Sequence, residues 1–372
     1  MSTLSLRRLN RTLLHRQQLD VRSDAGVVAA VERRVAVQAQ EPNWVHVGMA
    51  ARVSGFRTAD LDAAVASRAL VRGPLLRGTQ HLVSAADHGW LRPTVQPVLD
   101  RLVRSVYYAE HVGDLDPAVL VAAAREVLGD RTVRRRDLGA ALVERFPGRK
   151  GAVMAAAVEA LTPVAHDPAT SAFGSWWSRR SIAVTAADVW LGEPVGAPDV
   201  PALVRRYLAA FGPADVMDLQ TWCGLTRLRP AVDGMRAGLR TYRGPDGREL
   251  LDLPDAPLAD EDAPAPVRFL PMFDDAVLGH RDRTRILPEA VRRDVMPGWS
   301  MVRATVLVDG VVAATWEIVE GRLLVRPLRP LTPGEQDALE AEGATVADLV
   351  GADRDVELTS APRTPLPGAP RT

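Results

Sequence analysis

The hydrophobic and polar positions of the chain repeat one plan three times, several helical segments followed by a short pair of strands. In the first copy, AGVVAAVERRV places apolar residues at 27, 28, 31 and 35, on one helical face. WVHVGMAARV (44–53) predicts a second helix, and Thr58 is the expected cap of a third, ADLDAAVASR. ALVRGPLLRG and TQHLV then predict two strands around Gly73-Pro74. This order is typical of a winged helix.

The second copy begins at Asp116-Pro117, a helix cap followed by a proline at the first helical position. Its predicted helices span 117–128, 134–145 and 149–160. The third copy is the clearest, with a helix over 201–212 and a second in DVMDLQTWCG. Gly224 suits the left-handed position after that helix and Thr226 the following cap, as in a helix-turn-helix. LRTYRGPDGRELLDL is the expected wing.

Two further segments connect or follow these copies. Ser84 and Asp87 fit a capping box that opens a connecting helix through Arg104. After a proline-rich acidic linker (254–266) the hydrophobic period changes to two, with strands at 267–273 and in 301–328 that are split at Asp309-Gly310 and at Glu320-Gly321. LTPGEQDALEAEGATVADLVG predicts a closing helix, and the tail after it should be disordered.

The pattern therefore predicts an α+β protein of three tandem winged-helix modules followed by a small, barrel-like C-terminal β domain. The expected boundaries are 1–105 for the first winged helix with its connecting helix, 106–195 for the second and 196–255 for the third. The β domain spans 256–352, and 353–372 is the disordered tail.

Composition narrows the class of protein without naming it. The 372 residues are 47% hydrophobic and 25% charged, and 46 basic residues balance 46 acidic ones, as in ordinary globular proteins. Lys150 is the only lysine. A GC-rich genome is one explanation for this, but it also means that every cationic patch consists of planar guanidinium groups, which suit phosphate.

Several function classes lack the residues they need. The single cysteine, Cys223, excludes an internal disulfide and a cysteine-rich metal site, and the seven histidines include no HExxH motif. No metal or cofactor is therefore expected. The N-terminus lacks the apolar core of a signal peptide, and no span of 18 apolar residues occurs, which predicts a cytoplasmic protein without membrane contact. No heptad seam is present, so we expect a monomer.

Three winged helices in series favour a duplex ligand, although tandem winged helices also serve as protein-interaction scaffolds. The candidate phosphate contacts are arginines of the first and third copies: Arg57, Arg68, Arg77, Arg227, Arg229, Arg236 and Arg243. Trp176-Trp177 with Arg179 and Arg180 could wedge into nucleic acid, or belong to a core or interface. FDDAVLGHRDRTRI (273–286) could line a charged cleft with His280, Arg281 and Arg283, or be a neutralised surface loop.

Gln38 and Gln40 are the most specific candidates for chemistry. Pro42 biases Glu41 toward extended geometry, so the chain should straighten here. In an extended segment both amides face one way and Ala39 is anchored on the other side. A helix C-terminus tied off by amide side chains is the alternative that the spacing leaves open.

The chain resembles the bacterial AlkZ-like winged-helix DNA glycosylases over about 350 residues, in the segments VAVQAQEPNWVHVGMAARV, RGTQHLVSAADHGWL and FDDAVLGHRDRTRI. The family's hallmark is a hydrophobic residue between two glutamines, which Gln38-Ala39-Gln40 matches. Ala39, Gln80 and Gly279 depart from the residues expected in the family, which bears on the size of the substrate.

The resemblance implies a monofunctional DNA glycosylase that excises N7-alkylated purines from double-stranded DNA and could unhook interstrand crosslinks made by natural-product alkylators. Gln38 and Gln40 would be its catalytic residues. Such an adduct is cationic and leaves as a neutral base, so no general acid is needed, and two amide oxygens suffice to place a water. A non-catalytic winged-helix DNA-binding protein or regulator is the alternative function. The adduct, and whether the role is self-resistance or general repair, stay open.

Overall fold

The computed structural model of the protein describes residues 2–170, 182–298 and 300–360. Its first repeat follows the predicted order of elements. Three antiparallel strands pair in the order β1-β3-β2, so the strand that precedes the second helix lies beside the hairpin. The elements are α2 (Gly26–Arg33), β1 (Val37–Gln38), α3 (Trp44–Ala50), α4 (Thr58–Ala66), β2 (Leu70–Pro74) and β3 (Gln80–Ser84).

Two local predictions in this repeat are wrong. Helix α4 begins at Thr58, so its cap is Arg57, whose backbone N–H donates to the Asp60 carboxylate (3.0 Å). The hairpin turn falls at residues 75–79 rather than at Gly73-Pro74. Gly73 lies inside β2, and the position requires a glycine because a Cβ there would lie 2.7 Å from the Val164 carbonyl oxygen of the second repeat. The glycine serves close sheet packing instead of a turn.

The second repeat has the same order of elements and the strand order β4-β6-β5. All three of its predicted helices are present, and the Asp116 carboxylate accepts the Ala118 N–H (2.8 Å) at the predicted cap. The elements are α8 (Pro117–Leu128), β4 (Val133–Arg134), α9 (Arg135–Arg145), α10 (Gly151–Leu161), β5 (Val164–His166) and β6 (Ala183–Ala186).

The third repeat replaces its first strand by a single bridge between Ala214 and Leu251. Gly224 is left-handed (φ 83°), as predicted, but the cap of the next helix is Leu228 rather than Thr226. Pro230 explains the later start, because proline fits the first helical turn. The elements are α12 (Val200–Phe211), α13 (Val216–Cys223), α14 (Arg229–Met235), β7 (Arg240–Arg243) and β8 (Glu249–Asp252).

Helices outside the repeats connect them. Ser84 Oγ accepts the Asp87 N–H (3.2 Å), which is half of the predicted capping box, but the Asp87 carboxylate accepts from Trp90 and Arg206 instead of from the Ser84 N–H. The connecting helix is interrupted at Val95. Pro97 accounts for the break, since it has no N–H to donate to the preceding turn. These helices are α1 (Leu6–Arg16), α5 (Ala85–Thr94), α6 (Gln96–Val103), α7 (Val106–Val112) and α11 (Ala187–Leu191).

The C-terminal strands form one sheet in the order β13-β12-β11-β10-β9. Its described strands leave β13 and β9 as edges, so the expected barrel is an open sheet here. Asp309-Gly310 and Glu320-Gly321 make the predicted turns. The elements are β9 (Arg268–Leu270), α15 (Asp275–Leu278), α16 (Arg292–Val295), β10 (Thr305–Val308), β11 (Val311–Val319), β12 (Arg322–Pro327), α17 (Pro333–Val350) and β13 (Val356–Leu358).

Strand β13 corrects the prediction of a tail that is disordered from residue 353. Val356–Leu358 pairs in parallel with β12, and the gained main-chain pairing orders this segment. Residues 361–372 of the predicted tail lie outside the described residues.

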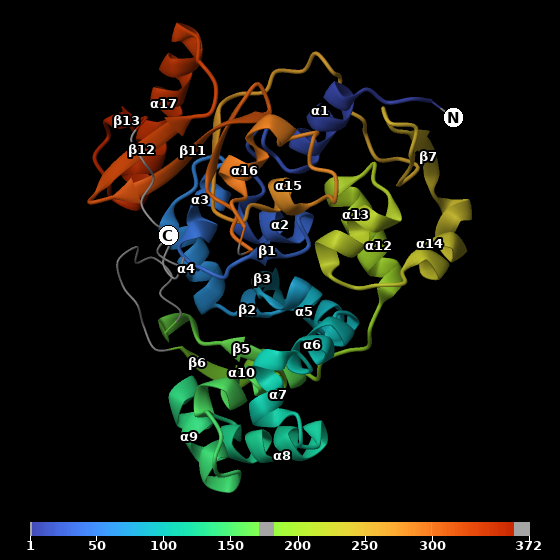
Figure 1. The fold of residues 1–372 in the computed structure, drawn as a ribbon, viewed down its shortest axis with the longest axis vertical. Coiled ribbons are helices and arrows are strands. Elements are labelled where there is room, and N and C mark those ends of the chain that lie inside the picture. The colour runs from blue at the N-terminus through green and yellow to red at the C-terminus, as the bar shows by residue number, and fades with distance from the viewer. Residues whose placement is uncertain (1, 171–181, 299, 361–372) are drawn as a thin grey trace.

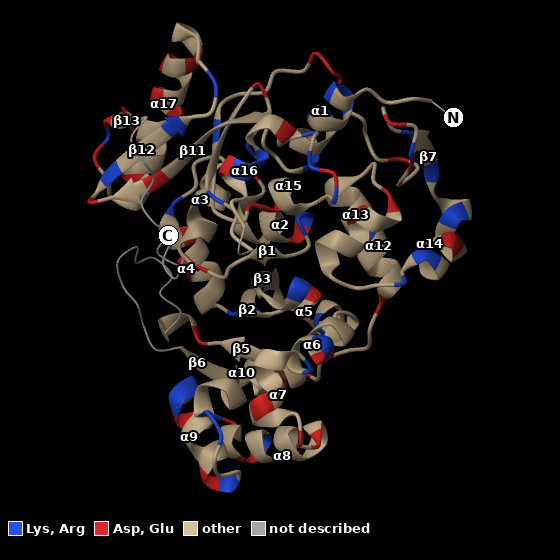
Figure 2. Ribbon diagram, in the orientation of Figure 1, with Lys and Arg blue, Asp and Glu red and all other residues tan. Residues whose placement is uncertain are grey.

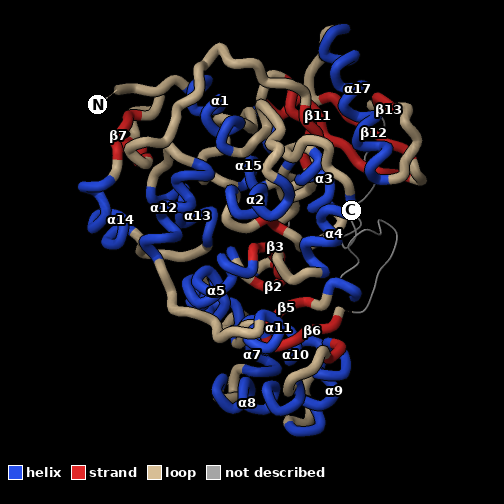
Figure 3. Tube along the Cα trace, turned by 180° about the vertical axis from the view of Figure 1, so that it is seen from behind, coloured by secondary structure: helices blue, strands red, loops and turns tan. Residues whose placement is uncertain are grey.

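The three repeats do not form separate hydrophobic cores. The largest cluster of buried apolar residues includes Leu13 of α1, Leu76 and Leu99 near the first repeat, Leu142 of the second and Trp222 of the third. Figure 1 places α8 and α9 at one end of the long axis, with β1, β2 and β3 near the middle. Seen from behind, β2 and β5 lie side by side (Figure 3), in agreement with the close approach at Gly73. Strand β1, which contains Gln38, therefore lies near the middle of the long axis.

Candidate active site around two glutamines

The segment with the two glutamines is a strand and not a helix end. Helix α2 ends at Arg33, and Val35 has a left-handed backbone (φ 71°) that stops the helix. Gln38 then pairs with His81 across β1 and β3, and the Ala39 N–H donates to the Gln80 carbonyl (2.8 Å). The prediction of extended geometry is confirmed for Gln38, which lies in β1, whereas Gln40 lies two residues beyond the strand at a bend. The helix-capping alternative is wrong because the helix ends before the first glutamine.

Burial alternates along this strand as the prediction requires. Val37 and Ala39 are buried, at 4% and 0% exposure, in a cluster that includes Leu61 and Leu82. Gln38 is half-buried and Gln40 is exposed. Both glutamines are thus more exposed than the anchored alanine between them.

Each amide oxygen already accepts one hydrogen bond from the protein. Arg77 Nη2 donates to Gln38 Oε1 (2.8 Å), and the Gln80 main-chain N–H donates to Gln40 Oε1 (3.2 Å). A carbonyl oxygen has two acceptor sites. Both glutamines therefore keep one free acceptor site on an oxygen whose orientation is fixed.

Arg77 is the first of two arginines that hold this strand. It lies in the turn between β2 and β3 with a left-handed backbone (φ 55°), and its guanidinium also donates to the Trp222 carbonyl of the third repeat. Burial lowers the pKa of Arg77, while the nearby Asp275 acts in the opposite direction. The structure thus turns Arg77, which we predicted as a phosphate contact, toward Gln38.

Arg72 holds the main chain of the same strand. Its side chain is 2% exposed, and it donates to the carbonyls of Ala39 (Nε, 2.9 Å) and Gln40 (Nη2, 3.3 Å). Its Nη1 lies 2.6 Å from His166 Nδ1, and His166 Nε2 lies 3.0 Å from a Glu159 carboxylate oxygen. Burial is the main cause that lowers the pKa values of Arg72, to about 10, and of His166.

Sequence reasoning missed Arg72, Glu159 and His166. The one available signal was an arginine inside a strand whose neighbours are apolar, since a buried charge requires a partner. Nothing in the sequence pointed to a partner 94 residues away.

The first part of the stretch 273–286 is buried, whereas Arg281 is exposed and Arg283 is half-buried. Asp274 is buried and accepts two hydrogen bonds from Arg52 (2.9 and 2.7 Å). His280 is 1% exposed, its Nε2 lies 2.9 Å from the Phe211 carbonyl oxygen, and burial holds its pKa well below the usual range. His280 therefore does not face DNA. Gly279 lies against the Phe211 ring, where a Cβ would lie 2.4 Å from Cδ1, so it serves packing.

The predicted DNA contacts on the surface fall into two groups. Arg57 pairs with Asp60 (2.8 Å), Arg236 with Glu249 (2.9 Å), and Arg68 lies over the Trp190 ring (4.6 Å) and donates to its carbonyl (2.9 Å). The second group has no side-chain partner among the described residues: Arg227, Arg229, Arg243, Arg281 and Arg283. Basic segments on α14 and β7 are visible in Figure 2. Trp177 and Arg179, with Trp176 and Arg180, lie outside the described residues.

Arg283 is the member of the second group whose charge interacts with Arg77, the partner of Gln38. It is half-buried, and its Nε is buried without a hydrogen-bond partner among the described residues. Burial lowers its pKa, and the positive charges of Arg292 and Arg77 lower it further.

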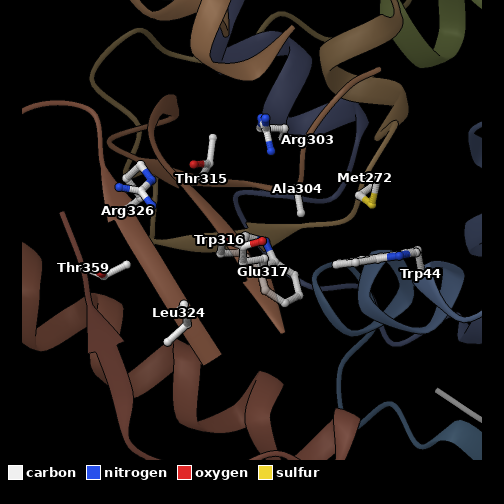
Figure 4. A pocket seen from close by; sticks show the side chains of 10 residues that line it. All are labelled: Trp44, Met272, Arg303, Ala304, Thr315, Trp316, Glu317, Leu324, Arg326 and Thr359. Atoms are coloured by element: carbon white, nitrogen blue, oxygen red, sulfur yellow. The ribbon is translucent and has the colours of Figure 1, made fainter. Parts of the chain in front are cut away.

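A small pocket lies between Trp44 at the start of α3 and the C-terminal sheet (Figure 4). Trp44, four residues after Gln40, makes an edge-to-face contact with Trp316 (ring centroids 5.0 Å, 64°). Arg303 and Arg326 also line this pocket. Because the two rings touch, no base stacks between them. The contact between Trp44 and Trp316 holds the start of α3 against the C-terminal sheet, and neither Gln38 nor Gln40 lines this pocket.

Across the described ranges, the side chains form no group of three or more His, Cys, Asp or Glu that could hold a metal ion. In the same residues, every helix is too short or too polar to cross a membrane.

Comparison with known proteins identifies the class of this fold. It matches the solved structure of the DNA glycosylase AlkZ from Streptomyces sahachiroi with a TM-score of 0.80, over 96% of this chain and 100% of that one, at 23% identity. The fold is thus that of a DNA glycosylase. The interstrand DNA cross-link repair glycosylase of the same organism is 28% identical over an alignment of 385 residues. The alignment covers 92% of this chain and 95% of that protein.

The family model described as DNA glycosylase AlkZ-like matches residues 31–349. The chain belongs to the AlkZ-like DNA glycosylase family, as its sequence resemblance predicted, and it is an enzyme of the DNA glycosylase class.

Proposed function

We propose that this glycosylase hydrolyses the N-glycosidic bond of cationic N7-alkylpurine adducts in double-stranded DNA, and that Gln38 and Gln40 hold the attacking water. The observation that carries the proposal is the pair of fixed amide oxygens, each with one acceptor site left. A single water has two protons to donate. When both amides accept them, the water's oxygen lone pairs remain directed at the sugar.

The substrate class follows from what these residues can and cannot do. An amide does not titrate at ordinary pH, so it neither protonates a leaving base nor removes a proton completely. An N7-alkylpurine needs no such acid. Its N9–C1′ bond breaks with the electron pair moving to the cationic base, which leaves neutral. The water oxygen forms the new bond to C1′, and its proton passes to solvent. Two carbonyl dipoles also stabilise the positive charge that develops on the sugar.

The reaction we propose is simple hydrolysis without a lyase step. A glycosylase that also cleaves the strand commonly uses an amine nucleophile that forms a Schiff base. Lys150 is the only lysine, and it precedes α10 in the second repeat, outside the strand of the glutamines. This placement supports a monofunctional enzyme.

The three repeats, each with its helices and strand pair, are proposed to be winged-helix modules that bind the duplex. The arginines without a side-chain partner among the described residues are the proposed phosphate contacts, and all of them except the half-buried Arg283 are exposed. Such contacts position DNA without reading its sequence. The name of the cross-link repair glycosylase of S. sahachiroi supports interstrand crosslinks as a second substrate class of this monomeric enzyme.

The test is single-turnover release of base from a duplex that carries N7-methylguanine. Replacing Gln38 or Gln40 by Ala should slow release about a hundredfold, the usual cost of one oriented polar contact in a transition state. DNA affinity and melting temperature should stay near parental values. Gln40→Glu should retain more activity than Gln40→Ala, because a carboxylate still accepts a proton and stabilises positive charge.

Gln336→Ala on α17 is the matched control, since it makes the same change on the C-terminal helix. Release by both alanine variants at the parental rate would remove the glutamines from the reaction.

A further inference from the structure

We infer that Arg77 and Arg72 are positioning residues of the glycosylase reaction: Arg77 fixes the amide of Gln38, and Arg72 fixes the main chain that carries Gln40. The inference rests on the proposed role of the two glutamines. In this inference the buried arginines do not contact DNA themselves, and they orient the two glutamines that act on it.

Arg77 decides which end of the Gln38 amide is available. A guanidinium only donates hydrogen bonds, so the atom 2.8 Å from Arg77 Nη2 is the amide oxygen and not the nitrogen. The amide oxygen and nitrogen are nearly equal in shape, and no other contact among the described residues distinguishes them. Without Arg77, Gln38 could rotate its N–H₂ group toward the water, where a donor would replace the acceptor that the reaction requires.

Arg77 is itself held on its other side. Its guanidinium donates to the Trp222 carbonyl at the end of α13, and its backbone is left-handed (φ 55°). Gly224, two residues after Trp222, packs against the Arg77 backbone, where a Cβ would lie 3.1 Å from the Arg77 Cα. The third repeat therefore sets the position of the Arg77 side chain, and through it the Gln38 amide.

Arg72 works on the main chain of the same strand. It reaches the carbonyls of both Ala39 and Gln40, which lie beyond the last paired residue of β1. Its third contact is His166 Nδ1 at 2.6 Å. Because the guanidinium can only donate, Nδ1 accepts, and the proton of the neutral imidazole is on Nε2, where it donates to Glu159. The second repeat thus fixes Arg72 through one tautomer of His166.

This arrangement predicts an effect on the chemical step rather than on DNA binding. Arg72 is 2% exposed, and Arg77 is directed at Gln38 and Trp222. Neither guanidinium is free for a phosphate. A misplacement of a reacting group by about 1 Å costs on the order of a hundredfold in rate. Loss of either arginine should therefore lower the excision rate and leave affinity for undamaged duplex nearly unchanged.

The experiment is a double-mutant cycle between Arg77 and Gln38, with single-turnover release of N7-methylguanine, duplex affinity and melting temperature measured for each variant. Arg77→Met should slow release between tenfold and a hundredfold, on the order of the misplacement cost. In the Gln38→Ala background the same change should cost nothing further. Arg77→Lys retains a charged donor and should recover part of the rate. Arg329→Met, at an arginine paired with Glu335 on the C-terminal helix, is the control.

The outcomes separate the two proposals. If Gln38→Ala releases base at the parental rate, the proposed role of the glutamines fails. If Gln38→Ala is slow while Arg77→Met is not, only the positioning role of Arg77 fails. Equal costs of Arg77→Met in both backgrounds would show a general structural role and overturn the inference as well.

Arg72 is tested through His166, because removal of a fully buried arginine could unfold the protein. His166→Phe removes the acceptor that Arg72 uses, and His166→Asn keeps a nearby acceptor oxygen. We expect His166→Phe to slow release about tenfold, a fraction of the full misplacement cost, and His166→Asn to recover part of it at comparable melting temperature. Equal rates for the two variants would refute the positioning of Gln40 through Arg72.

Discussion

Asp275 should make the stability of this protein fall as pH rises from acid to neutral, and Asp275→Asn should remove that component. The carboxyl group is 1% exposed, and its Oδ1 has no hydrogen-bond partner among the described residues. Burial, together with the neighbouring charge of Asp274, raises the pKa of Asp275 to about 7 against the opposing effect of Arg34, Arg77 and Arg52.

The direction follows from the raised pKa. The unfolded chain ionises this carboxyl near its ordinary value of 3.8, whereas the native protein keeps it protonated until about pH 7. The stabilising contribution is therefore complete below about pH 3.8 and is lost as the pH rises through 7. Between pH 5 and pH 8 the loss amounts to about 2–3 kcal/mol, since one pKa unit corresponds to about 1.4 kcal/mol.

The assay is urea unfolding of the parent protein and of Asp275→Asn at pH 5 and at pH 8. Asparagine has the same shape and never ionises, so the difference in the free energy of unfolding between the two proteins should change by about 2–3 kcal/mol in favour of the variant at pH 8. Titration of other groups, such as the buried His81, occurs in both proteins and cancels. If the difference in the free energy of unfolding is the same at both pH values, the raised pKa of the buried Asp275 carboxyl is refuted.

Two further predictions concern packing and DNA contact. Gly73→Ala should destabilise the protein by about 1–3 kcal/mol in thermal unfolding, the usual cost of overpacking, because its Cβ would lie 2.7 Å from the Val164 carbonyl oxygen. Gly89→Ala in α5 is the control, since its Cβ would have nothing within 4 Å, and it should not destabilise the protein. Equal losses of stability in the two variants would contradict the close approach of the two sheets. Arg281→Ala should weaken binding of unrelated duplexes by a similar factor and lower the salt dependence of the binding constant by about one phosphate contact. An unchanged salt slope would exclude Arg281 from the interface.

The sequence by itself determined the elements and the geometry of the motif. Helix α8 spans 117–128 as its apolar period and Asp116 cap predict, and the turn at Asp309-Gly310 is where the strand period breaks. These features depend on neighbours within a few residues, which the sequence displays. The buried Ala39 between two less buried glutamines likewise follows the alternation that the local pattern predicts.

Only the tertiary structure decided what surrounds those glutamines. An arginine looks the same in the sequence whether it faces solvent or an interior acceptor, since the choice depends on partners that folding brings near. Arg77 meets a carbonyl 145 residues away, and Arg72 meets a histidine 94 residues away. His280 is buried beside Phe211, and Asp275 is buried near several arginines that lie in the interior with it. Local pattern fixes where a side chain points along its own element, and long-range packing fixes what it touches.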